Sequence, residues 1–291
     1  MKLLPLLLAG IIALLALPTP FPARAQSIPP LALIPMQEPA LQQELNRVVE
    51  ANGWEHMVAA GNFAIALVVL EDWGGYRLAM LNGRQMLYAA SLPKIAILFA
   101  AMVASQEGEL VIDKALEEDL HNMIRVSCNA CATRAMVRVG RDRLLATLQR
   151  PEYGFYDDEG YGGLWVGKDY GKNPAHRRDP LKGLSHGATA FQVARLYYRL
   201  EMDILLDAKH TRMMRDMLSR PGISHKFVKA LEGQQVKMLR KSGSWKNYHS
   251  DSVLVDSPLG RYILVGLVDD PNGEQTLQDL ARAVHKLVAG L

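Results

Sequence analysis

The feature that most constrains the fold is the stretch of residues 92–104, which is apolar on nearly every side. As a helix it must be surrounded by protein, because a helix at the surface shows a polar face. Three more helical patterns follow it, at 113–125, 130–139 and 141–150. The sequence therefore predicts a central buried helix packed among other helices.

Apolar runs typical of β-strands stand on both sides of this helical middle. Two come before it, joined by a Gly74-Gly75 turn, and three come after it. Strands at both ends of a chain with helices between them imply one sheet assembled from the two ends. The expected strands are 63–70, 76–81, 237–245, 252–256 and 262–268, and the other expected helices are 41–49, 188–202, 208–218 and 277–289.

The first 25 residues have the pattern of a secretory signal, with Lys2, an apolar run at 3–17 and the small-x-small sequence Ala23-Arg24-Ala25. A membrane anchor is the alternative, but an anchor needs roughly 20 apolar residues, and prolines crowd the far end of this run. We expect cleavage, a leader over residues 26–40, and a secreted or periplasmic protein without stable membrane insertion. Loss of Lys2 and Arg24 lowers the formal charge of +3 by two, so the mature chain is nearly neutral and is not expected to bind nucleic acid.

The first chemical pattern, Ser91-Leu92-Pro93-Lys94, stands at the start of the apolar helix. Pro93 suits the first helical turn, where its missing N–H costs nothing. Serine and lysine three positions apart share one helical face. A lysine in an apolar site loses its charge more easily, so Lys94 can act as a base toward Ser91. Taken alone, an N-cap serine with a surface lysine explains the pattern equally well.

Two more short patterns follow. Ser127-Cys128-Asn129 lies between two helical segments, where its serine could pass a proton to a leaving nitrogen and its amide could orient a substrate carbonyl. Lys241-Ser242-Gly243 lies in a strand: the lysine supplies positive potential, Ser242 can bind a carboxylate, and the glycine allows close approach to the strand. The next backbone N–H, that of Ser244, could complete an oxyanion hole with that of Ser91. Taken singly, these patterns are a helix cap and an ordinary strand.

Together and in this order, the three patterns resemble those of class A β-lactamases and related penicillin-binding proteins, the penicillin-recognising serine hydrolases. The resemblance spans roughly residue 40 to the end. It implies an α/β (α+β) fold: an antiparallel sheet flanked by N- and C-terminal helices, plus an all-helical lobe. The site would lie in the cleft between the α/β lobe (41–90 and 205–291) and the helical lobe (91–204) of one catalytic domain (41–291).

The resemblance also implies roles for the residues of the patterns. Ser91 would be the acylated nucleophile, Lys94 its proton partner and Ser127 a proton relay. The catalytic residues would be Ser91, Lys94, Ser127 and Lys241, and the substrate-binding residues would be Asn129, Ser242, Gly243 and Ser244.

One element of the family pattern is missing. Class A enzymes carry Glu-x-x-Leu-Asn in the loop after the second pattern, and its glutamate activates the water that frees the acyl enzyme. Residues 151–182 lack this sequence but are rich in aromatic residues, which predicts a packed, functional loop. The loop offers Glu152, Asp157, Asp158, Glu159 and Asp169 as candidate carboxylates, none in the expected context. Acylation is therefore better supported than deacylation.

Cys128 and Cys131 are the only cysteines, and their spacing could indicate a redox pair or half of a metal site. No second pair completes four zinc ligands, so we expect no metal and favour two small buried residues over a disulfide.

A separate pattern, Gly183-x-Ser185-x-Gly187, fits the nucleophile elbow of α/β-hydrolases. The elbow needs a strand directly before it, and here a polar segment ending in Pro180 precedes. We expect Ser185 to cap the following helix and His186 to be structural.

The sequence thus predicts an exported active-site-serine hydrolase that opens β-lactam rings through an acyl-serine intermediate. The alternatives are a D,D-peptidase acting on the D-Ala-D-Ala ends of peptidoglycan, and a penicillin- or peptidoglycan-binding sensor that does not turn over. The expected partner is a small-molecule β-lactam or a cell-wall peptide. We expect no cofactor and a monomeric protein.

Overall fold

The computed structural model describes Leu33, residues 36–72 and residues 74–290. The expected signal segment, residues 1–25, and the first part of the leader lie outside the described residues. The helices are α1 (Pro39–Ala51), α2 (Glu55–Ala59), α3 (Lys94–Gln106), α4 (Lys114–Arg125), α5 (Asn129–Val139), α6 (Arg141–Gln149), α7 (Ala190–Glu201), α8 (Ala208–Leu218), α9 (Phe227–Ala230) and α10 (Gly273–Ala289). The strands are β1 (Phe63–Leu70), β2 (Tyr76–Leu81), β3 (Leu87–Tyr88), β4 (Tyr156–Asp157), β5 (Gly162–Gly163), β6 (Trp165–Val166), β7 (His186–Ala188), β8 (Lys237–Trp245), β9 (Tyr248–Ser257) and β10 (Gly260–Asp269).

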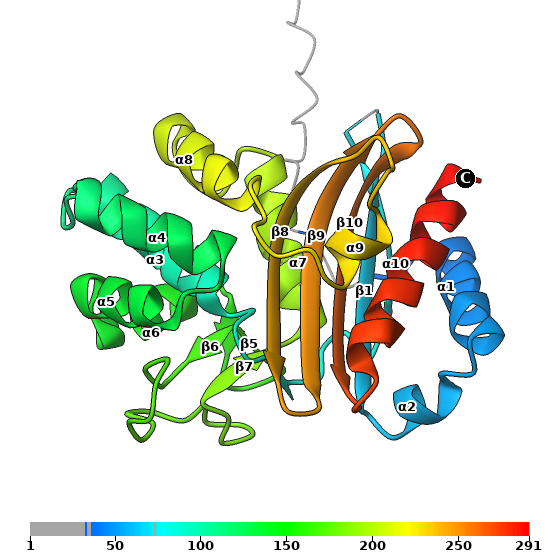
Figure 1. Ribbon diagram of the computed structural model, residues 1–291, viewed down its shortest axis with the longest axis horizontal. Coiled ribbons are helices and arrows are strands. Elements are labelled where there is room, and N and C mark those ends of the chain that lie inside the picture. The colour runs from blue at the N-terminus through cyan, green and yellow to red at the C-terminus, as the bar shows by residue number, and fades with distance from the viewer. Residues whose placement is uncertain (1–32, 34–35, 73, 291) are drawn as a thin grey trace, which may run out of the picture. The chain divides into compact units, whose positions relative to one another are not determined.

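Five strands form one antiparallel sheet in the order β2-β1-β10-β9-β8. β1 pairs with β10 along its whole length, from Phe63 opposite Val268 to Leu70 opposite Arg261. A strand from the N-terminal part of the described chain therefore pairs with one from the C-terminal part inside the sheet, which confirms the expected α+β architecture (Figure 1). β8 stands at one edge, with β9 as its strand neighbour.

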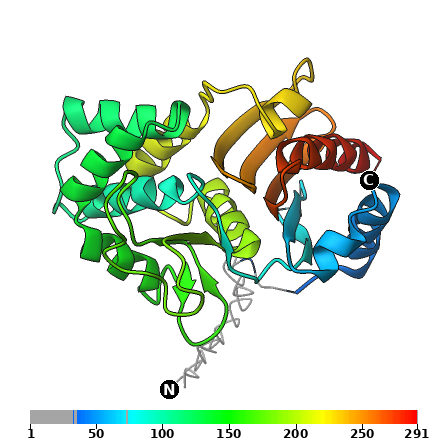
Figure 2. The same cartoon turned by 60° about the horizontal axis from the view of Figure 1, so that its bottom comes forward.

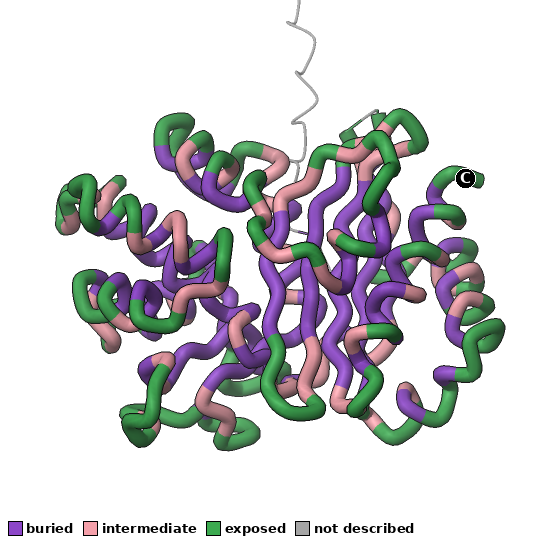
Figure 3. Tube along the Cα trace, in the orientation of Figure 1, coloured by how far each residue is buried: buried purple, intermediate pink, exposed green. Residues whose placement is uncertain are grey.

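Helices cover both faces of the sheet (Figures 1 and 2). Side chains alternate along β1 as the pleat requires: Ile65 and Leu67 pack with α1 and α10, whereas Ala64 and Ala66 join the core on the opposite face. Because both faces are covered, all eight residues of β1 are buried, and Figure 3 shows the same burial along the central strands. This is why β1 is apolar throughout rather than at every second position.

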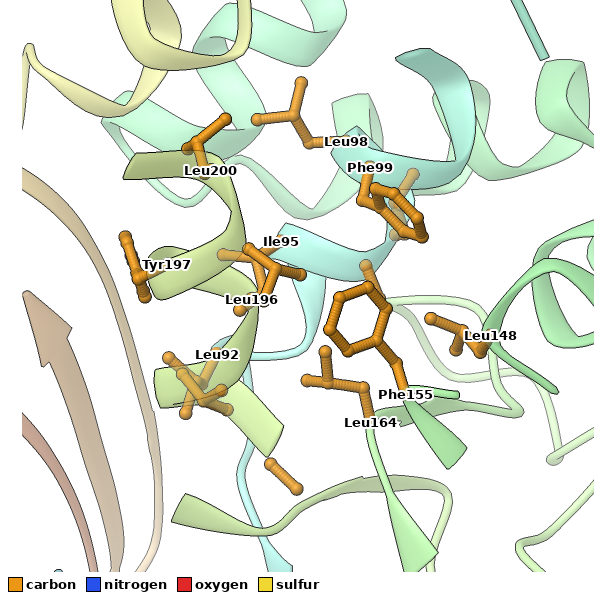
Figure 4. Close-up of a cluster of buried hydrophobic side chains, with 14 of the residues drawn as sticks. Leu92, Ile95, Leu98, Phe99, Leu148, Phe155, Leu164, Leu196, Tyr197 and Leu200 are labelled. Atoms are coloured by element: carbon orange, nitrogen blue, oxygen red, sulfur yellow. The ribbon is translucent and has the colours of Figure 1, made fainter. Parts of the chain in front are cut away.

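α3 occupies the centre of the core on the other side of the sheet (Figure 4). Every residue from Lys94 to Ala104 is buried, as the all-round apolar sequence predicts. Phe99 makes edge-to-face contacts with Tyr153 and Phe155, at centroid distances of 4.9 and 5.2 Å. Truncating such a buried aromatic side chain to alanine costs about 3–5 kcal/mol. This core fixes the start of α3, and with it the position of Ser91.

Residues 151–182 form the packed loop that their aromatic content predicts. The loop contributes a two-stranded ladder (β4, β5) and, with β3 and β7, the three-stranded sheet β3-β7-β6. The indole Nε1–H of Trp165 donates to the carbonyl of Arg177 at 3.0 Å, and the hydroxyl of Tyr156 donates to Asp179 at 3.2 Å. These bonds join distant parts of the loop to each other, and the pairing of β6 with β7 holds the loop beside β7.

The beginning of α7 corrects one expectation. Thr189 is its N-cap and accepts a hydrogen bond from the N–H of Gln192 at 3.2 Å. Ser185 does not cap this helix, because β7 stands between them. Residues 167–185 form no strand, so Ser185 does not lie on a nucleophile elbow either.

The division into lobes at residues 90/91 and 204/205 remains a prediction, and α7 from the expected helical lobe packs against β1 and β10. Across the part of the chain that the structure describes, no helix combines the length and apolarity needed to cross a bilayer.

Candidate active site

The three sequence patterns come together although up to 150 positions separate them. Ser91 lies in the turn that leads into α3, Ser127 in the turn between α4 and α5, and Lys241 in β8. The hydroxyl of Ser127 is hydrogen-bonded by both Lys241 Nζ, at 3.1 Å, and Lys94 Nζ, at 3.4 Å. One hydroxyl therefore joins all three segments.

The ammonium of Lys94 is enclosed by residues of the second pattern and of the long loop. Its side chain is fully buried, and Nζ donates to the carbonyl of Ser127 at 2.6 Å and to Oδ1 of Asn129 at 2.7 Å. The ring of Tyr170 lies beside it, with its centroid 4.4 Å from Nζ. Burial lowers the pKa of Lys94 to about 7. Lys94 can therefore exist as a free amine near neutral pH, although in the described chain its hydrogen bonds go to Ser127 and Asn129 and not to the hydroxyl of Ser91.

Ser127 holds its place through an unusual backbone conformation, with φ at +58°. Such left-handed geometry is costly for a residue with a side chain, and here it turns the hydroxyl between two lysines. Both lysines donate when they are charged, which leaves the serine proton available for a third partner. Burial, and next the charge of Lys94, keep the pKa of Lys241 well below its usual range.

Gly243 brings β8 against the backbone of the nucleophile. A Cβ on this glycine would lie 2.6 Å from the nitrogen of Ser91 and 2.4 Å from the carbonyl oxygen of Ala89. The close approach that Gly243 allows is therefore that of the turn containing Ser91. The backbone of Ser91 and the following residue of β8, Ser244, consequently meet at one pocket.

The side chain of Ser242 faces the segment that precedes α9. It is buried, and its hydroxyl is 3.0 Å from Nε2 of His225. Burial lowers the pKa of His225 to about 4, so the imidazole is neutral at pH 7. Lys241 and Ser242 are the two groups expected to hold a substrate carboxylate. In the structure the hydroxyl of Ser242 is hydrogen-bonded to His225, and Nζ of Lys241 donates to the hydroxyl of Ser127 and to the carbonyl of Ser242.

The pocket has a volume of about 550 Å³. Three of the predicted site residues, Ser91, Asn129 and Ser244, line it, while the buried lysines lie behind them. Aromatic residues form much of the remaining wall. The pocket is lined by Tyr88, Ala90, Ser91, Asn129, Lys168, Asp169, Tyr170, Gly171, Lys172, Leu184, Ser185, His186, Ser244, Trp245 and Tyr248.

Among the acidic residues of the long loop, Asp169 is the one that lines this pocket within the described chain. Both of its oxygens accept hydrogen bonds from Arg141, at 2.9 and 2.8 Å. The Arg141 guanidinium keeps the pKa of Asp169 below its usual range. Asp169 is therefore an ionised partner of an arginine rather than a free base.

The prediction of two separate cysteines is wrong. Cys128 and Cys131 form a disulfide, with Cα atoms 5.3 Å apart. The bridge closes the first turn of α5, where Cys128 is the N-cap and its sulfur accepts from the N–H of Cys131 at 3.1 Å. Since Ser127 and Asn129 flank Cys128, the disulfide braces the second pattern.

Sequence reasoning missed the part of the pocket wall that the long loop and β7 form. His186 lies in the pocket, with Nδ1 3.2 Å from the Ser185 hydroxyl and Nε2 3.0 Å from the carbonyl of Lys168. Burial lowers its pKa to about 4, so it is a neutral hydrogen-bonding group at pH 7. The ring of Tyr170 packs on His186 at a centroid distance of 4.3 Å. The cluster of Gly, Tyr and Asp in the loop was the available signal for this wall.

A family model and several solved structures match this chain. The model of the β-lactamase enzyme family matches residues 113–288. The β-lactamase of Sphaerobacter thermophilus DSM 20745 has a similar structure, with a TM-score of 0.66 and 17% identity over 86% of this chain and 98% of that chain. PBP-A is similar with a TM-score of 0.65 and 19% identity, over 90% of this chain and 100% of that chain.

A mutant of PBP-A, solved as an acyl-enzyme complex with penicillin G, gives a TM-score of 0.64 and 22% identity, over 88% of this chain and 98% of that chain. None of the curated proteins matches the chain in sequence.

Proposed function

The chain belongs to the β-lactamase enzyme family, and from that premise we propose that β-lactams acylate Ser91 and that the protein hydrolyses the resulting ester. The observation that carries this proposal is the position of Lys94, which is the first residue of α3, three positions after Ser91. It is buried and hydrogen-bonded to both Ser127 and Asn129. The acyl-enzyme complex of the PBP-A mutant with penicillin G supports the same chemistry here.

Acylation would use Lys94 as the base. As a free amine it takes the proton of the Ser91 hydroxyl while the oxygen attacks the lactam carbonyl carbon. The new C–O bond forms, and the carbonyl electrons move to the oxygen. Collapse of this intermediate breaks the C–N bond of the ring, and the leaving nitrogen takes the proton of Ser127, which the Lys94 ammonium replaces. Lys241 stabilises Ser127 during this exchange from 3.1 Å.

The oxyanion would be bound by the backbone N–H groups of Ser91 and Ser244. Gly243 supports this assignment, since its lack of a side chain lets β8 approach the nitrogen of Ser91. Removing one such donor typically slows acyl transfer by about 10²–10³-fold. The N–H groups belong to a fixed helix start and a sheet edge, so they need no reorganisation as charge develops.

A second candidate function is supported by the state of the loop. Asp169 is tied to Arg141, and an aromatic ring, that of Tyr170, lies beside the Lys94 ammonium. If the described residues supply no free carboxylate next to the ester, the acyl group would stay on the serine for a long time. This arrangement favours a D,D-peptidase or a penicillin-binding sensor as the alternative to fast β-lactam turnover.

A chromogenic cephalosporin separates these functions. Sustained colour release over many equivalents supports the β-lactamase, whereas a burst of one equivalent supports slow deacylation. In the second case, release of D-alanine from a peptide ending in D-Ala-D-Ala identifies the peptidase. The absence of both a burst and turnover would refute acylation by β-lactams. The expected export is tested separately, by sequencing the N-terminus of the protein recovered from the periplasm or medium.

A further inference from the structure

A third buried lysine, which the steps above do not use, lies behind β8. Lys226 precedes α9, its side chain is fully buried, and its φ of +49° is a left-handed conformation. Its Nζ donates to the carbonyl of Gly243 at 2.5 Å, to the hydroxyl of Ser244 at 2.7 Å and to the carbonyl of Ser250 at 3.3 Å. All three N–H groups of the ammonium therefore donate to the paired ends of β8 and β9.

The hydrogen bond from Lys226 to the carbonyl of Gly243 fixes the direction of the next backbone N–H, that of Ser244. The carbonyl of Gly243 and the N–H of Ser244 are the two ends of one peptide group, and in a trans peptide they point in opposite directions. With the carbonyl directed at Lys226, the N–H points away from it. Ser244 lines the pocket that also contains Ser91, so this N–H is the donor assigned above to the oxyanion.

A cation at a peptide carbonyl acts on the other end of the group. It withdraws electron density from the oxygen, which makes the N–H more acidic and a stronger donor, and hydrogen bonds in series reinforce one another in this way. A charge-assisted bond is also shorter and stronger than a neutral one, so it fixes the orientation of the peptide plane. The hydroxyl of Ser250 adds only a longer contact, 3.4 Å, to the same carbonyl.

Building on the proposed acylation of Ser91, we propose that Lys226 is a positioning residue of the oxyanion hole: its ammonium orients and polarises the Gly243–Ser244 peptide, whose N–H binds the oxyanion of the β-lactam or peptide substrate. Lys226 does not touch the substrate. It acts through one peptide group, and its effect is largest when negative charge develops on the oxygen.

The surroundings of Lys226 keep it mostly charged at pH 7. Burial lowers its pKa to about 8, Asp251 and Glu274 raise the pKa, and Arg240 lowers it. Asp251 is itself paired with Arg240 through two hydrogen bonds of 2.8 Å. The ammonium is therefore retained at neutral pH and is lost within an experimentally accessible range above it.

The test is the infrared band of the ester carbonyl in the acyl-enzyme, because hydrogen bonds in an oxyanion hole lower this stretching frequency. In Lys226→Met the band should move to higher wavenumber, and acylation should slow about 10- to 100-fold, less than for complete loss of a donor. Lys226→Arg, which keeps a cation, should restore the wild-type band at least in part. Lys229→Met is the matched control, since Lys229 is exposed on α9, the helix that Lys226 precedes, and the band of this variant should be unchanged.

An unchanged band and rate in folded Lys226→Met would overturn this inference alone. Failure of the wild-type protein to form any acyl-enzyme would instead refute the proposed function, and the inference with it. If the variants do not fold, the wild-type band measured from pH 7 to pH 10 provides the same test. It should move to higher wavenumber with a midpoint near pH 8, and a constant frequency over that range would contradict the role of Lys226.

Discussion

Gly243→Ala tests the contact on which the oxyanion hole depends. The added Cβ would lie 2.4 Å from the oxygen of Ala89, 2.6 Å from the nitrogen of Ser91 and 2.7 Å from the nitrogen of Leu92. These are backbone atoms, which cannot rotate away as a side chain would. Ordinary contact begins at 3.4 Å, so β8 and the Ser91 turn must separate by about 1 Å.

The consequence should be much larger for activity than for stability. Overpacking of this kind costs about 1–3 kcal/mol of folding free energy, whereas a displacement of about 1 Å between nucleophile and oxyanion donor costs on the order of 100-fold in acylation. Stopped-flow acylation by a chromogenic cephalosporin measures the second effect, and urea unfolding measures the first. Gly290→Ala is the control, because its Cβ would meet only atoms at 3.5 Å or beyond. Wild-type acylation by folded Gly243→Ala would refute the assigned oxyanion hole.

Three further predictions follow from buried groups. The rate of acylation should rise with pH around a midpoint near 7, because Lys94 loses its proton there. Lys94→Ala should slow acylation by about 10²–10⁴-fold. A stopped-flow rate independent of pH from 6 to 8 would exclude the lysine as base. Asp251→Ala should lower the unfolding free energy by about 3–5 kcal/mol, because it leaves the buried Arg240 unpaired, and a urea midpoint equal to wild type would contradict this. Replacing Cys128 and Cys131 together by serine should cost about 2 kcal/mol through lost loop-closure entropy; insensitivity of the wild-type midpoint to a reductant would argue against the bridge.

The sequence predicts those features that depend on local pattern. The apolar character of α3 on all sides predicts that the helix is buried. The apolar runs before and after the helical middle of the chain predict strands that pair in one sheet. Ser91, Ser127 and Lys241 could be found because each lies in a short pattern of fixed spacing. Their proximity in the structure depends on tertiary packing: α3 lies among α4, α5, α6 and α8, and the turn before it meets β8 at Gly243.

The features that the sequence does not predict depend on contacts between distant elements. Lys226 carries no local signal, since nothing in its neighbours indicates that β8 will pass within hydrogen-bonding distance. Tyr170 and His186 are recognisable only as an aromatic loop residue and a histidine until the loop packs beside Lys94. The sequence does not predict the disulfide, because a C-x-x-C spacing in a helical pattern fits two unbonded cysteines as well as two that are bonded across the first helical turn.

If a buried lysine and its neighbours activate one serine, the acyl group must be found on that residue. Wild-type protein treated with penicillin and digested should yield one modified peptide, and tandem mass spectrometry should assign the added mass to Ser91. The same treatment of Ser91→Ala should give no adduct. Modification at Ser127 or Ser185 instead, or an adduct that persists in Ser91→Ala, would show that Ser91 is not the acylated nucleophile.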